Sequence, residues 1–117
     1  MSDNFRVVLD DKFLPVQVFF NAIPDRRFID TLMAFESGSG AGFNDACCSF
    51  PGEEEFDEEP LTGVEFAIKD EKVVIGSQDF LWVLEKACKA YLDDYPSMAD
   101  QIAELLPKIR AKVSSLI

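Results

Sequence analysis

Residues 63–75 read GVEFAIKDEKVVI, and this stretch decides the fold class. Val64, Phe66 and Ile68 alternate with Glu65 and Ala67, which is the period-two pattern of a half-buried β-strand. A polar run at residues 69–72 predicts a turn, and the apolar residues 73–75 predict the returning arm of a hairpin. The stretch therefore predicts a small antiparallel sheet on which helices can pack.

Two helices and a further strand are predicted upstream of this hairpin. Residues 13–23 carry apolar side chains at helical spacing, and Pro24 ends the helix. Asp25 is expected to cap a second helix. The apolar side of that helix is formed by Phe28, Ile29, Leu32, Met33 and Phe35. The glycine-rich residues 37–42 are interpreted as a flexible connection, and residues 46–50 as a short strand.

Two more helices are predicted downstream. Ser77 is the expected N-cap of the first, and Pro96 ends it. Its apolar side is formed by Leu81, Leu84, Cys88, Tyr91 and Tyr95. Ser97 with Asp100 forms a capping box for the last helix, in which Pro107 predicts a kink or a restart. The apolar side of the last helix is formed by Met98, Ile102, Leu105, Ile109 and Val113.

The order of these elements predicts the α+β class and a single domain over residues 1–117. Two N-terminal helices, a small antiparallel sheet of about three strands and two C-terminal helices are expected.

The composition excludes several classes of function. The 117 residues contain 22 acidic and 11 basic side chains, a net charge of −11, and no histidine. Without histidine there is no Ser-His-Asp or Cys-His nucleophile and no imidazole metal site. An acidic surface also repels nucleic-acid phosphates. Catalysis by two carboxylates needs a buried pair, which nothing in the pattern marks, so we expect no enzyme, no cofactor, no metal and no direct nucleic-acid partner.

The acidic residues are concentrated in the middle of the chain. No lysine or arginine lies between Arg27 and Lys69. That stretch contains ten acidic residues, namely Asp30, Glu36, Asp45, Glu53, Glu54, Glu55, Asp57, Glu58, Glu59 and Glu65. The rest of the chain is nearly neutral, with 11 basic and 12 acidic residues. Residues 51–60, bracketed by prolines and holding six carboxylates, are predicted to form an acidic loop.

Three interpretations of the acidic loop are open. It is a solvated loop, a calcium site or an interaction surface, and the EF-hand spacing with its internal glycine is absent. As an interaction surface, it would dock into a basic groove on a partner, with Phe43 or Phe56 filling a pocket. The candidate binding residues are Asp45, Glu53, Glu54, Glu55, Phe56, Asp57, Glu58, Glu59 and Glu65. Trp82 is expected in the core or at a partly covered surface position.

The cysteines and the N-terminus indicate a compartment. The three cysteines, Cys47, Cys48 and Cys88, form neither a C-x-x-C motif nor a secreted disulfide framework. Reduced and mostly buried thiols are therefore expected. The N-terminus has no signal-peptide pattern, and no apolar run reaches the length of a membrane span. These features favour a cytoplasmic protein with no membrane partner.

Several stretches resemble a known family. They are FFNAIPDRRF at residues 19–28, GFNDACCSFP at 42–51 with the acidic insertion after it, GVEF at 63–66, and residues 80–96. Over about residues 15–106 the chain is similar to the immunity proteins of bacterial contact-dependent growth inhibition systems, or CDI systems. Within these CdiI-like proteins it resembles the branch that is paired with ribonuclease toxins.

The resemblance implies a bacterial cytoplasmic protein that binds the C-terminal toxin domain delivered by a neighbouring cell. Such a protein would inactivate a nuclease by covering its active site or its RNA-binding surface. The charge distribution agrees with this, because a nuclease is basic where it holds RNA and charge complementarity speeds association. An alternative is an acidic adaptor that mimics nucleic acid and binds a basic DNA-binding protein.

Overall fold

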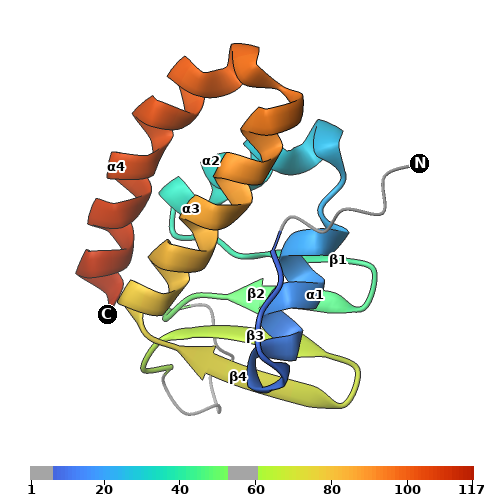
Figure 1. Cartoon of the computed structure of the whole chain (residues 1–117). Helices are drawn as coiled ribbons and strands as arrows, with labels where there is room; N and C mark the ends of the chain where they lie inside the picture. Colours follow the sequence, from blue (N-terminus) through green and yellow to red (C-terminus); the bar gives the residue numbers. More distant parts are fainter. Residues whose placement is uncertain (1–6, 53–60) are drawn as a thin grey trace.

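The computed structural model describes residues 7–52 and 61–117 and confirms the α+β class (Figure 1). Four α-helices and four strands form the fold, with three short 3₁₀ turns between them, in the part of the chain that is described. In chain order they are η1 (Asp11–Phe13), α1 (Leu14–Ala22), η2 (Asp25–Arg27), α2 (Phe28–Glu36), β1 (Ala41–Phe43), β2 (Ala46–Ser49), β3 (Val64–Ile68), β4 (Glu71–Ile75), α3 (Ser77–Asp94), η3 (Pro96–Met98) and α4 (Ala99–Leu116).

The strands form one antiparallel sheet in the order β1-β2-β3-β4. The hairpin of β3 and β4 is confirmed, with Val64 paired to Ile75 at one end and Ile68 to Glu71 at the other. Its turn is therefore residues 69–70, shorter than the polar run 69–72 predicts. The backbone of Lys72 pairs with Ala67. A lysine is tolerated at this position because β4 is an edge strand, on which its side chain stays exposed.

The glycine-rich stretch is more ordered than a flexible connection. Gly38 has a positive φ of 79° and ends α2 in a Schellman motif, in which the Ser39 amide donates to the Ala34 carbonyl. The chain then forms β1, whose pairing with β2 makes the sheet four-stranded. Phe43 anchors this strand, because its ring centre lies 5.8 Å from that of Phe19.

A cluster of phenylalanines fills the space between the sheet and the helices. All its members are fully buried and come from α1, α2, β3, α3 and the end of β2: Phe19, Phe20, Phe35, Phe50, Phe66 and Phe80. Phe66 of β3 meets Phe19 of α1 at 5.4 Å and Phe80 of α3 at 6.2 Å between ring centres. Figure 1 shows α1 across the sheet, and α2 and α3 add Phe35 and Phe80 to the cluster. One face of the sheet is therefore buried by aromatic rings.

The two C-terminal helices run side by side in opposite directions (Figure 1). Four of the five residues predicted for the apolar side of the last helix are confirmed, since Ile102, Leu105, Ile109 and Val113 are the buried residues of α4, whereas Met98 lies in the η3 turn and is half-buried. α4 continues through Pro107 without a restart. The buried side of α3 is rotated from the predicted one: it consists of Phe80, Val83, Leu84, Ala87, Cys88 and Tyr91, while Tyr95 is exposed.

The caps predicted for the two C-terminal helices do not form. α3 begins at Ser77 itself with Gly76 as its N-cap, and α4 begins at Ala99 after the η3 turn that contains Ser97. Asp25 starts the η2 turn that leads into α2, and its Oδ2 accepts a hydrogen bond of 3.0 Å from the Tyr95 hydroxyl. A 3₁₀ turn also leads into α4, as is common at the N-terminus of a helix.

Replacing Phe66 by alanine tests the aromatic cluster. Phe66→Ala should lower the free energy of unfolding by about 3–5 kcal/mol, because it removes a ring that packs against α1 and α3 and leaves a cavity. The measurement is urea unfolding followed by circular dichroism. Val74→Ala on the adjacent strand is the control, since this side chain is 44% exposed, and should cost less than about 1 kcal/mol. Equal losses in the two variants would contradict this description of the core.

Candidate functional site

The face of the sheet opposite the aromatic cluster is open. On β2 the side chains of Ala46 and Cys48 are buried while Cys47 between them is exposed, which shows the two faces directly. The register places seven residues on the other face, and we call this surface the open face: Gly42, Cys47, Ser49, Glu65, Ala67, Lys72 and Val74. All seven are exposed or half-buried. Among the described residues, no helix packs on this face (Figure 1).

Glu65 lies on a central strand of the open face, near one end of the sheet. It is on β3, where its cross-strand neighbours are Ser49 of β2 and Val74 of β4. The Glu65 side chain is half-buried, whereas Val74 is 44% exposed. A carboxylate beside an exposed apolar side chain suits a lysine or arginine, whose alkyl stem packs on the apolar neighbour while its charged end meets the acid.

Asp45 lies at the other end of the sheet. It is exposed in the two-residue turn between β1 and β2, next to Asn44, whose φ is 56°. Asp45 precedes Ser49, the partner of Glu65, by four residues, which corresponds to about 13 Å along a strand. The structure therefore does not bring these two predicted binding residues together.

Most of the predicted binding residues lie outside the described residues: Glu53, Glu54, Glu55, Phe56, Asp57, Glu58 and Glu59. The described chain on either side of them is well anchored, because Phe50 and Val64 are fully buried. Gly63 fits closely against β4, where a Cβ atom would collide with the Ile75 carbonyl oxygen. We call residues 53–60 the acidic segment. The strands before and after it in the sequence meet at the end of the sheet that carries Glu65.

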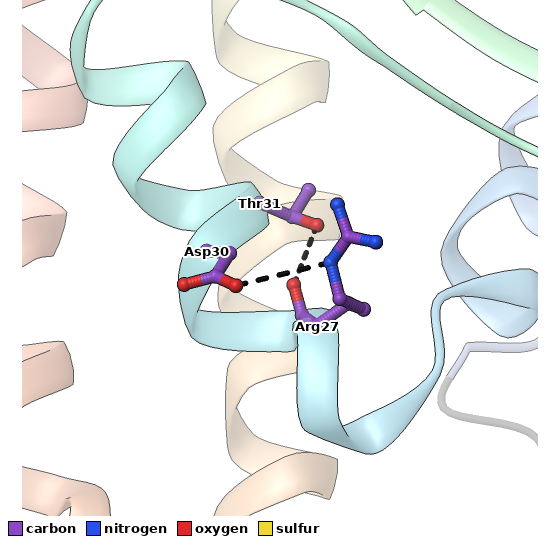
Figure 2. A network of polar contacts seen from close by, with 3 residues as sticks. All are labelled: Arg27, Asp30 and Thr31. Atoms are coloured by element: carbon purple, nitrogen blue, oxygen red, sulfur yellow. Dashed lines mark hydrogen bonds and ion pairs between the residues drawn. The ribbon is translucent and has the colours of Figure 1, made fainter.

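A cavity of about 320 Å³ lies between α2 and β1, near the Asp45 turn. Figure 2 shows its polar residues: Arg27 Nε is 3.8 Å from Asp30 Oδ2, and the Thr31 hydroxyl donates to the Arg27 carbonyl at 2.7 Å. The guanidinium of Arg27 lies 6.0 Å from the ring centre of Phe43. Phe43, a candidate pocket-filling residue, thus lies between the core and Arg27. The paired charges give the cavity no strong preference for a charged ligand.

Trp82 occupies a partly covered surface position on α3. It is 54% exposed, and the ammonium of Lys86 lies 4.6 Å from its ring centre. A pocket of about 30 Å³ next to it is lined mainly by apolar side chains, namely Leu9, Phe13, Val16, Ile75 and Val83. This pocket is too small for more than one small side chain or a water molecule.

The three cysteines are free thiols in different surroundings, with Cys47 exposed and both Cys48 and Cys88 buried. Burial raises the pKa of the Cys88 thiol to about 12, and the nearby Glu85 carboxylate adds to the rise. A hydrogen bond to Asp25 similarly raises the pKa of the Tyr95 hydroxyl. The described residues contain no group of three side chains suited to hold a metal ion. In residues 7–52 and 61–117, no helix is long and apolar enough to cross a membrane.

Alkylation should distinguish the three thiols. Iodoacetamide at pH 8 should modify Cys47 in the native protein and leave Cys48 and Cys88 unmodified until urea unfolds the chain, because the reagent cannot reach buried thiols. Peptide mass spectrometry identifies the modified positions.

The raised pKa of Cys88 also predicts how the stability of the fold depends on pH. This thiol should leave the free energy of unfolding unchanged below pH 9 and should lower it as the pH rises toward 12, since the thiol ionises first in the unfolded chain. Rapid native modification of Cys88 would contradict its placement.

Comparison with known proteins adds one finding. A family model described as CDI immunity protein matches residues 5–106, which is most of the chain. The chain matches no curated protein.

Proposed function

The chain belongs to the family of CDI immunity proteins, and on that premise we propose that its partner is a toxin nuclease, specifically a ribonuclease. Family membership implies that it binds and neutralises a cognate CDI toxin, and the family is generally non-catalytic. In our proposal the chain acts in the bacterial cytoplasm. An acidic surface of the chain covers the basic active-site or RNA-binding surface of the toxin.

The observation that carries this proposal is the separation of charge along the chain. Ten acidic residues and no basic residue lie between Arg27 and Lys69, while the remainder is close to neutral. A ribonuclease needs a basic surface to hold the phosphate backbone of its RNA substrate. A concentrated acidic region is complementary to that surface and therefore speeds association and disfavours wrong partners.

The acidic segment, residues 53–60, is attached to the sheet and not to the two C-terminal helices. The strands before and after this segment, β2 and β3, pair at Ser49 and Glu65, so Glu65 lies at the end of the sheet from which the segment departs. By contrast, α3 and α4 carry five basic residues among their acids, and two ion pairs balance charge there. Arg110 Nη2 lies 3.2 Å from Glu85 Oε1, and Lys108 Nζ lies 3.5 Å from Glu104 Oε1. A basic partner is accordingly attracted to the sheet end of the molecule.

The first experiment is direct. The toxin domain encoded beside this chain's gene should co-purify with it and should lose its ribonuclease activity on RNA in the complex. A toxin with another activity would contradict the ribonuclease assignment. Co-purification with a DNA-binding repressor instead of a toxin would favour an acidic adaptor.

Neutralising the acidic segment tests the mechanism. Glu53, Glu54, Glu55, Asp57, Glu58 and Glu59 are changed together to glutamine or asparagine, which shifts the net charge from −11 to −5. Association with the toxin should slow by about 10- to 100-fold at low salt, and its salt dependence should weaken, because electrostatic steering is lost. Stopped-flow or surface plasmon resonance measures both quantities.

The matched control neutralises six acids on α3 and α4, namely Asp79, Glu85, Asp93, Asp94, Asp100 and Glu104, with the same change in net charge. It should retain most of the association rate. If the two variants slow association equally, net charge alone explains the effect and the acidic segment is not part of the interface.

A further inference from the structure

The open face of the sheet has the form of a binding platform. Its side chains near β2 are small, with Cys47 paired across the strands to Gly42 on one side and to Ala67 on the other. A partner can therefore approach the backbone of the sheet closely over this area. No described helix covers it, although the opposite face is packed with aromatic rings.

The open face carries two charged side chains, Glu65 and Lys72, and the pairing of Glu65 with Val74 gives this face a chemical preference. Glu65 and Val74 are direct cross-strand neighbours, so a single side chain from a partner can contact both. Covering the half-buried Glu65 without a cation would leave a desolvated charge, which is strongly unfavourable. A lysine or arginine avoids this cost, because its stem packs on Val74 and its charged end pairs with Glu65.

We propose that the open face of the sheet is the surface on which the toxin docks, with Glu65 and Val74 receiving a lysine or arginine of the toxin. This inference rests on the proposed function, because it takes a basic toxin as the occupant. The inference adds to the proposed function the place where the toxin binds, which is on β3 and β4 of the sheet.

The charge of the chain decides between a toxin and a second copy of this chain as the occupant. Two copies joined through the open face would bring together two chains of net charge −11, with their acidic segments connected at that end of the sheet. Such a pair repels itself. A basic protein is attracted by the same charges, so it is the occupant that fits.

Protection of Cys47 tests the position of the toxin without any change on the open face. Cys47 is the exposed one of the three cysteines, so an alkylating reagent reports on this face in the natural chain. With the purified toxin domain at about 100 times its Kd, alkylation of Cys47 should slow about 100-fold, because the free fraction is about 1%. A thiol introduced on α4 by A103C, at an exposed position, is the control and should keep its rate.

A pair of matched variants tests the role of Glu65. Glu65→Gln should weaken toxin binding by about 10- to 100-fold, since it removes one partner of a covered charge pair. Glu104→Gln on α4 makes the same chemical change at an exposed position and should alter affinity by less than about threefold. Thermal unfolding of both variants checks that they fold as the natural chain does.

The outcomes separate this inference from the function on which it rests. Protection of Cys47 together with a selective loss in the Glu65 variant supports it. A toxin that binds while Cys47 reacts at its free rate overturns the docking position and leaves the proposed function intact. Equal effects of the two glutamine variants overturn the role of Glu65. A purified toxin domain that does not bind the chain at all overturns both proposals.

Discussion

Burial of the phenylalanine cluster on one face of the sheet is the constraint on which the rest of the structure depends. Phe66 from the sheet, Phe19 and Phe20 from α1 and Phe80 from α3 meet in one core, so the helices are held to a single side. The opposite face is left open as a consequence. The same core holds the residues that flank the acidic segment in the sequence, because Phe50 before it and Val64 after it are fully buried. The packing of the aromatic core therefore determines the end of the sheet from which the acidic segment departs.

The distribution of charge also differs between the helices and the sheet. In the described part of the chain, the ion pairs join helical residues, as in Arg110 with Glu85, and they keep that side nearly neutral. Such exposed pairs add little to stability. The sheet end instead carries Glu65 and the attachment points of a segment with six carboxylates in seven residues. In the proposed function this asymmetry speeds the association of the chain with a basic toxin and disfavours wrong partners.

The sequence predicts the elements whose signal is local. Alternation over residues 64–68 and helical spacing from Ile102 to Val113 identify β3 and α4, because each pattern reports which side chains are buried. β1 is not predictable in this way, since its short glycine-containing stretch becomes a strand only by pairing with β2. The candidate site divides similarly. Alternation on β3 suffices to separate Glu65 from the buried face. Its pairing with Val74 and its distance from Asp45 depend on strand register, which is a long-range property.

A crystal structure of the chain bound to its cognate toxin tests the central claim most directly. The account predicts that the basic substrate-binding surface of the toxin covers the open face and the acidic segment, with a lysine or arginine of the toxin against Glu65. A complex in which the toxin is held by α3 and α4 while the open face remains in contact with solvent would contradict it.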